Sequence, residues 1–174
     1  MPHSLPPSPW IVRWKALIAP RASVLDLACG SGRHMRHLLE TGHAVTGVDR
    51  DVSGIADLAG RPDVEIVAAN LEDDSPWPLG ERRFGAVLVA NYLHRPLFDT
   101  LLATVAPGGA LLYETFAAGN ERYGKPSNPD FLLREGELLE VARGRLHVVA
   151  YETVETRRPR QAVVQRIAAV KAKG

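Results

Sequence analysis

Residues 24–33 constrain the fold of this chain more than any other stretch. They read VLDLACGSGR: an apolar run containing one acid leads to two glycines two residues apart, and a segment with helical spacing follows. Glycine lets the backbone adopt a positive φ and approach a ligand, and a helix behind such a turn presents free N–H groups. The stretch therefore predicts a strand, a ligand-binding turn and a helix.

Length and composition indicate one globular domain. The chain has 174 residues, of which 45% are hydrophobic and 24% are charged, and these values are typical of a single soluble domain. The formal net charge of +1 gives no field that would indicate a polyanionic partner. We expect one domain over residues 1–174, with a flexible proline-rich start at residues 1–9.

Three features predict a soluble cytoplasmic protein. Cys29 is the only cysteine, so the chain forms no internal disulfide. The first residues lack the pattern of a signal peptide, and no apolar run has the length of a membrane span. Cys29 and the neighbouring histidines do not have the spacing of a zinc site, so we expect no metal.

Strand-like apolar runs alternate with helical patterns over most of the chain. They predict strands over 23–28, 44–48, 64–68, 84–90 and 110–116, and helices over 10–19, 33–40, 51–58, 96–105 and 131–143. This alternation is typical of an α/β fold with parallel strands and right-handed crossovers. The polar segments 69–83 and 117–129 are expected to be loops, the second long enough to act as a lid.

The last two predicted strands, 145–155 and 161–170, are joined by only five residues, 156–160. So short a link cannot make a parallel crossover, so the two strands are expected to form an antiparallel hairpin. Its arginines are interpreted as protection of a sheet edge against pairing with another chain.

The residues around the first turn indicate what it binds. A dinucleotide fingerprint needs a third glycine, but Gly30 and Gly32 are followed by Arg33, His34 and Met35. Asp26 inside the strand is unfavourable for phosphates and suits an ammonium group. A second acid, Asp49, ends the next strand, where it can accept from both hydroxyls of a ribose. The pattern predicts an amino-acid-bearing nucleoside.

Residues 24–33 and 45–49 (VTGVD), together with the terminal hairpin, resemble class I S-adenosylmethionine-dependent methyltransferases. Residues 113–116 and 119–124 are similar to small bacterial methyltransferases of the tellurite-resistance type. The resemblance to the class I family covers roughly residues 22–170. It implies a Rossmann-like three-layer sandwich around a mostly parallel seven-stranded sheet of order 3-2-1-4-5-7-6 with an antiparallel last strand. It also implies S-adenosyl-L-methionine as cofactor. The cofactor-binding residues that it implies are Asp26, Ala28, Gly30, Gly32, Asp49, Arg50, Asn70, Leu71 and Asn91.

Residues 91–97 open the next predicted helix at the ligand-binding edge of the sheet. His94 and Tyr92 are candidate catalytic residues there, because histidine readily exchanges a proton near neutral pH. The alternative for His94 is a structural role. The candidate acceptor contacts are Arg95, Glu114, Asn120 and Tyr123.

The core fold uses nearly every residue, which favours a small-molecule methyl acceptor and direct displacement. Two alternatives stay open: an RNA-modifying methyltransferase that uses the basic hairpin as its phosphate contact, and a non-catalytic protein that binds S-adenosylmethionine. We expect no membrane partner. One fold hosts many chemistries, so the resemblance does not identify the acceptor.

Overall fold

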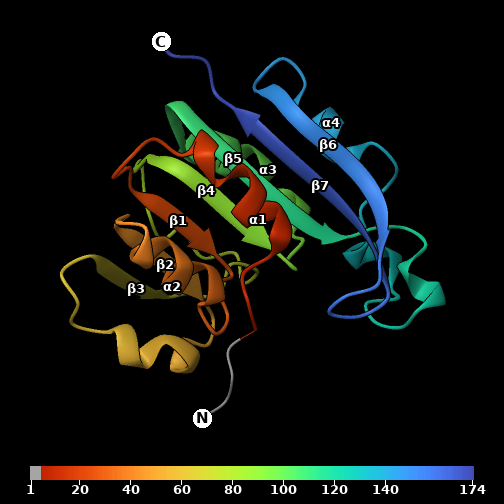
Figure 1. The fold of residues 1–174 in the computed structure, drawn as a ribbon, viewed down its shortest axis with the longest axis horizontal. Coiled ribbons are helices and arrows are strands. Elements are labelled where there is room, and N and C mark those ends of the chain that lie inside the picture. The colour runs from red at the N-terminus through yellow and green to blue at the C-terminus, as the bar shows by residue number, and fades with distance from the viewer. Residues whose placement is uncertain (1–4) are drawn as a thin grey trace.

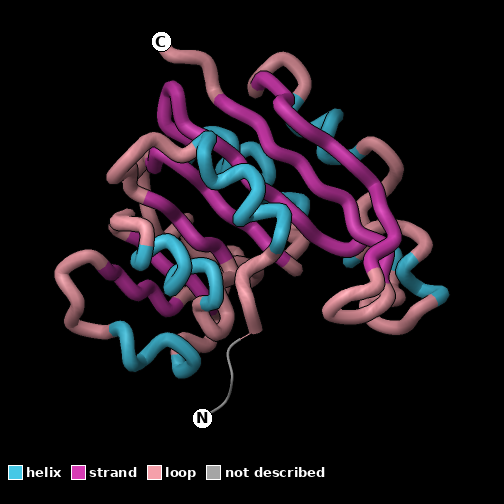
Figure 2. Tube along the Cα trace, viewed as in Figure 1, coloured by secondary structure: helices cyan, strands magenta, loops and turns pink. Residues whose placement is uncertain are grey.

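A computed structural model describes residues 5–174 of the chain (Figures 1 and 2). Within these residues, seven strands form one sheet. The strands are β1 (Val24–Leu27), β2 (Val45–Asp49), β3 (Val64–Ala68), β4 (Phe84–Ala90), β5 (Val105–Phe116), β6 (His147–Thr156) and β7 (Ala162–Val170). The α-helices are α1 (Pro9–Trp14), α2 (Arg33–Glu40), α3 (Phe98–Thr104) and α4 (Glu137–Ala142).

The strand order is β3-β2-β1-β4-β5-β7-β6. Strand β1 pairs in parallel with β2 and β4, whereas β7 pairs antiparallel with both β5 and β6. The predicted order and the terminal hairpin are therefore confirmed. The interpretation of the hairpin arginines as edge protection is wrong for Arg166, because β7 lies between two other strands (Figure 1).

Two apolar cores lie on the two faces of the sheet. Ala86 and Leu88 of β4 belong to the core that includes side chains of α1 and α2. Val87 and Val89, which alternate with them, belong to the core that includes side chains of α3 and α4. Alternate side chains of β4 therefore point to opposite faces of the sheet. Helices cover both faces, as is typical of a buried parallel strand.

Several predicted boundaries differ from the structure. The helix expected over 131–143 is wrong in its first half: Leu133 pairs with Ala117 in a β-bridge, and α4 begins only after Gly136, whose φ is 71°. Pairing with a neighbouring segment outweighs helical propensity there. The helix expected over 51–58 is a 3₁₀ helix, Ser53–Leu58. Strand β5 begins five residues earlier than expected, at Val105.

The N-terminal segment packs against the sheet. Of the flexible start expected over 1–9, residues 1–4 lie outside the described residues. Ser8 is only 2% exposed; its backbone N donates to Nε2 of His34 at 3.0 Å, and its hydroxyl donates to Glu114 at 2.7 Å. Burial lowers the pKa of His34 to about 3, so its ring stays neutral and accepts this bond.

The predicted loop over 117–129 contains a short 3₁₀ helix, Asn120–Arg122. Asn120 is buried, donates to the Pro126 carbonyl at 2.9 Å and accepts from the Val163 backbone at 3.0 Å. These bonds fasten the loop to β7. None of the helices in residues 5–174 has the length and hydropathy of a membrane span.

Candidate active site

The strand order reverses between β1 and β4, because the chain leaves β1 toward β2 and leaves β4 toward β5. Open α/β sheets bind ligands at such a point, beyond the carboxyl ends of the strands. Ala28 and Asn91, which directly follow β1 and β4, have φ values of 53° and 56°. Non-glycine residues rarely adopt this conformation, and it occurs preferentially at functional sites.

A first cavity of about 270 Å³ lies at this edge, and we call it the Asp26 cavity. Asp26 is 2% exposed, and its Oδ2 has no hydrogen-bond partner in the described part of the chain. Burial raises the pKa of Asp26 to about 7; the charge of Arg33 opposes the rise, and that of Asp49 adds to it. An unpartnered buried carboxyl oxygen in a cavity wall fits a cationic group of a ligand.

A second cavity of about 160 Å³, the Asp49 cavity, shares Ala28 with the first. The Asp49 carboxylate is held by two backbone donors: Gly30 N lies 2.8 Å from Oδ2, and Asp51 N lies 3.0 Å from Oδ1. Each oxygen keeps a further lone pair. The carboxylate is therefore held in place and can still accept from two ligand hydroxyls.

Residues 24–109 match the model of a methyltransferase domain family. This match to a methyltransferase domain covers 86 of the chain's 174 residues. No curated protein sequence matches it significantly.

Solved methyltransferase structures share this fold. TehB from Haemophilus influenzae has 19% identity and a TM-score of 0.74 over 92% of this chain, which spans 61% of that protein. A 1,6-didemethyltoxoflavin-N1-methyltransferase from Burkholderia thailandensis has 25% identity and a TM-score of 0.70, over 95% of this chain and 77% of that one. A TehB-like methyltransferase from Corynebacterium glutamicum has 23% identity and a TM-score of 0.64, over 93% of this chain and 87% of that one.

The Burkholderia thailandensis enzyme was solved with S-adenosylhomocysteine bound, and the two cavities of the present chain fit the parts of S-adenosylmethionine. Its ammonium group suits the unpartnered oxygen of Asp26, and its ribose hydroxyls suit the held carboxylate of Asp49. Tyr92 in the Asp49 cavity also has a buried hydroxyl without a hydrogen-bond partner in residues 5–174. The polar atoms that the protein leaves unpaired thus lie where a polar cofactor is expected.

Nearly all the predicted cofactor residues lie together. The residues that line one or both cavities are Asp26, Ala28, Gly30, Asp49, Arg50, Asn70, Leu71 and Asn91. Gly32 lines neither cavity. It caps α2 with a φ of 75°, and a Cβ there would lie 2.5 Å from Ile55 Cγ2, so the turn and its packing require glycine at this position. Asn70 accepts from Glu72 N at 3.0 Å, which fixes its side chain.

The raised pKa of Asp26 predicts pH-dependent binding of S-adenosylhomocysteine. With a pKa of about 7, the carboxyl is mostly ionised at about pH 8 and mostly protonated at about pH 6, and only the ionised form pairs with the ammonium group. We expect the affinity to fall about tenfold over this range, with proton release on binding. Calorimetric titrations in buffers of different ionisation enthalpy measure both effects.

Asp26→Asn is the control for this experiment, because the asparagine side chain has no proton to lose. The affinity of this variant for S-adenosylhomocysteine should therefore not vary with pH. A wild-type affinity equally independent of pH would contradict the assignment. The free energy of unfolding is expected to depend on pH in the opposite direction to the affinity. The folded state binds this proton more tightly than the unfolded chain, so the stability contributed at low pH is lost as pH rises from 3.8 to about 7.

The two predicted catalytic residues lie in different surroundings. Burial, with the nearby Glu72 carboxylate, raises the pKa of Tyr92 to about 12. Its phenol therefore stays protonated at neutral pH and can donate but not act as a base. His94 lines neither cavity, and its Nδ1 lies 3.7 Å from a carboxylate oxygen of Glu72.

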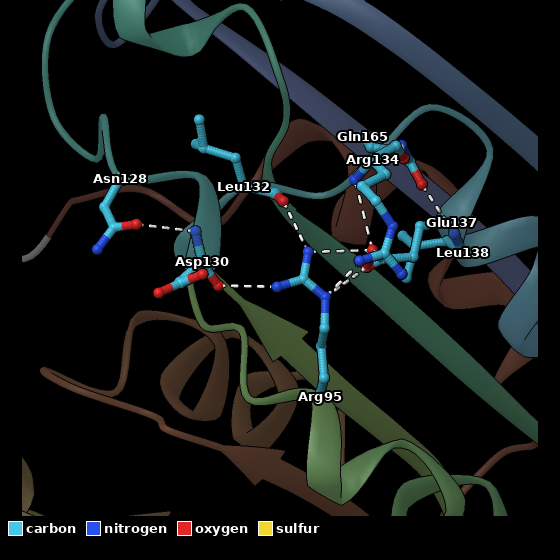
Figure 3. A network of polar contacts seen from close by, with 8 residues as sticks. All are labelled: Arg95, Asn128, Asp130, Leu132, Arg134, Glu137, Leu138 and Gln165. Atoms are coloured by element: carbon cyan, nitrogen blue, oxygen red, sulfur yellow. Dashed lines mark hydrogen bonds and ion pairs between the residues drawn. The ribbon is translucent and has the colours of Figure 1, made fainter.

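Arg95, a predicted acceptor contact, instead holds the loop before α4 (Figure 3). Its guanidinium donates to Glu137 at 3.0 to 3.2 Å, and to the carbonyls of Asp130 at 2.9 Å and Leu132 at 2.8 Å. Glu137 is buried and also pairs with Arg134 at 3.1 Å. The network joins the turn after β4 to the start of α4.

A third cavity, of about 430 Å³, meets the Asp26 cavity at Arg33 and Asn91, and we call it the arginine cavity. Among the four predicted acceptor contacts, Glu114 lines it, whereas Arg95, Asn120 and Tyr123 do not. Ser8, Phe116 and the hairpin arginines Arg158, Arg160 and Arg166 also line it. The sequence predicts these arginines as edge protection or as a phosphate contact, not as part of a cavity wall. Ser8 and the arginines come from the two ends of the chain, so no local pattern in the sequence brings them together.

Cys29 beside the cofactor turn is not a reactive group. It is 8% exposed, and burial raises the pKa of its thiol to about 12. Within residues 5–174, no three His, Cys, Asp or Glu side chains are grouped as metal ligands would be.

Proposed function

We propose that the chain transfers the methyl group of S-adenosylmethionine to a small-molecule acceptor by direct displacement. The observation that carries this proposal is the arginine cavity, which opens from the Asp26 cavity at Arg33 and Asn91. Its volume of about 430 Å³ is in the range of small-molecule sites. The acceptor and the reactive end of the cofactor would therefore meet near Asn91.

The residues around this point position the reactants. S-adenosylmethionine, when bound, supplies an electrophilic methyl group, and the bonding pair stays on sulfur when a nucleophile takes that group. Asn91 N donates to the Glu114 carbonyl at 2.9 Å, which fixes the turn between the cavities. The N-terminal segment covers the same region, because Leu5 lines both the arginine cavity and the Asp26 cavity. Alignment and exclusion of water are the contributions of this arrangement.

Both carboxylate oxygens of Glu114 are bound within the protein, one of them in an ion pair. One carboxylate oxygen accepts from the Ser8 hydroxyl, and the other accepts from Arg166. A soft nucleophile such as a thiolate reacts without a base. The site therefore suits an acceptor that arrives already nucleophilic.

The similar structures and the hairpin geometry support a small acceptor over RNA. The Burkholderia thailandensis enzyme was solved with 1,6-didemethyltoxoflavin and S-adenosylhomocysteine bound. In the present chain, Arg158, Arg160 and Arg166 line the arginine cavity. Arg158 and Arg160 are also exposed, so the acceptor test includes RNA, whose phosphates bind exposed basic side chains.

The experiment is a screen of small thiols, amines and phenols with S-adenosylmethionine, reading S-adenosylhomocysteine by mass spectrometry. We expect acceptor-dependent product with at least one class, and loss of this product in Asp49→Ala. Product formed only with RNA would favour the RNA-modifying alternative. Binding of S-adenosylhomocysteine without product from any acceptor would favour a non-catalytic protein.

A further inference from the structure

The arginine cavity has a wall of guanidinium groups. Arg33 reaches it from the start of α2, Arg158 and Arg160 from the turn between β6 and β7, and Arg166 from β7. Figure 1 shows this turn at the edge of the sheet to which the arrowheads of β1, β4 and β5 point. The cationic wall therefore faces the same edge as the cofactor cavities.

One of these arginines is neutralised within the protein. Arg166 pairs with Glu114 and, at 2.8 Å, with Glu152. Its side chain is 16% exposed and that of Glu114 is 9% exposed. This buried group of one cation and two carboxylates needs no further anion.

Within residues 5–174 the other three arginines form no ion pair, although the charge of Arg33 acts on the Asp26 carboxyl. Arg33 donates to the Pro6 carbonyl at 3.2 Å, and Arg160 donates to the Lys125 carbonyl at 2.8 Å. Arg158 makes no hydrogen bond or ion pair within residues 5–174, and neither Arg33 nor Arg160 forms an ion pair there. Three like charges around one cavity repel one another, and an anion placed among them removes this repulsion.

The remaining wall is polar at Ser8, Asn91, Glu114 and Thr156 and otherwise apolar, with an aromatic platform. The Arg160 guanidinium lies 4.8 Å from the centre of the Phe116 ring, and Pro159 and Val164 line the same cavity. Phe116 and Asn91 also line an adjoining cavity of about 340 Å³, to which Phe131 contributes a half-exposed ring. A ligand that reaches from the arginines toward Asn91 thus passes along apolar surface.

We propose that the methyl acceptor is an organic carboxylate with an apolar or aromatic body, whose carboxylate is bound by Arg158 in the turn between β6 and β7. The body lies along Phe116, and this placement presents the nucleophile at the opposite end near Asn91. A guanidinium donates two parallel N–H groups to a carboxylate, which gives orientation as well as affinity. This inference rests on the proposed function and adds the chemical class of its substrate.

The binding test uses the full chain saturated with S-adenosylhomocysteine and two probes of one shape, benzoate and benzamide, followed by ligand-observed NMR. We expect benzoate to bind about tenfold or more tightly than benzamide. Arg158→Ala should weaken benzoate binding about tenfold or more and leave benzamide binding unchanged. Arg157→Ala is the matched control: its exposed neighbouring side chain does not line the cavity, so it should change neither.

Three results would overturn the proposal: no binding of benzoate, equal binding of the two probes, or unchanged benzoate binding in Arg158→Ala. Inorganic phosphate is the third probe. Competition by phosphate as strong as by benzoate would show a general anion site and no preference for an organic acid.

A turnover arm separates this inference from the proposed function. It compares 4-mercaptobenzoate with 4-mercaptobenzamide as acceptors. A higher kcat/KM for the acid supports both methyl transfer and the preference for a carboxylate. Equal kcat/KM values for the two thiols would contradict the preference for a carboxylate and still support methyl transfer. Tight benzoate binding without turnover of either thiol counts against methylation of this acceptor class and leaves the carboxylate site standing.

Discussion

Replacing Glu137 with alanine is expected to lower the free energy of unfolding by about 3 kcal/mol or more. The substitution leaves the Arg95 guanidinium, whose side chain is 27% exposed, without its carboxylate partner. Removing the buried partner leaves a charge that is only partly solvated and that two backbone carbonyls do not neutralise. A loss of this size is a large part of the 5–15 kcal/mol that holds a typical domain folded. Urea unfolding followed by circular dichroism measures it.

Arg134→Ala is the matched control, because Arg134 contacts the same carboxylate at 3.1 Å but its side chain is 73% exposed. Exposed ion pairs contribute about 1 kcal/mol or less. We therefore expect a small loss for Arg134→Ala and a large loss for Glu137→Ala. Similar losses of unfolding free energy in the two variants would show that the burial of Glu137 does not determine its contribution to stability.

The second large effect is expected on cofactor binding. Asp49→Ala should weaken the binding of S-adenosylhomocysteine at least about 100-fold, because two hydrogen bonds to a carboxylate are lost, each worth about 1.5–3 kcal/mol. Calorimetric titration at a pH well above 7 measures this affinity without interference from Asp26. Circular dichroism checks that the variant, which also loses the acceptor for Gly30 N, is folded.

Asp51→Ala serves as control for Asp49→Ala. Asp51 lies two residues further on and accepts from Ser53 N at 2.9 Å, but it does not line the Asp49 cavity. The affinity of the Asp51→Ala variant for S-adenosylhomocysteine should stay within a few-fold of wild type. Equal losses in the two variants would mean that the segment's folding, and not the ribose contact, controls binding.

The grouping of the candidate cofactor residues at one sheet edge was predictable because these residues follow local patterns in the sequence. Asp26, Gly30 and Asp49 lie in or directly after consecutive strands, so parallel pairing alone brings them to one edge of the sheet. Position along the chain does not give the direction of a side chain. Arg95 was placed correctly after β4, yet its guanidinium binds the loop before α4.

The arginine cavity could not be predicted because its walls come from opposite ends of the chain. Ser8 and Arg158 are brought together only by the placement of β7 beside β5 and by the packing of the N-terminal segment. Nothing local to Arg158 distinguishes an arginine that lines a cavity from one that protects an edge. The helix predicted over residues 131–136 is also wrong because of a contact distant in the sequence. The backbone there pairs with Ala117 in a β-bridge and is not helical.

A crystal structure of the chain with S-adenosylhomocysteine tests the central claim most directly. We predict the amino-acid end in the Asp26 cavity, the ribose on Asp49, and the sulfur facing Asn91, where the arginine cavity opens. An adenosine bound in the Asp26 cavity, or a ligand that contacts neither Asp26 nor Asp49, would contradict this account.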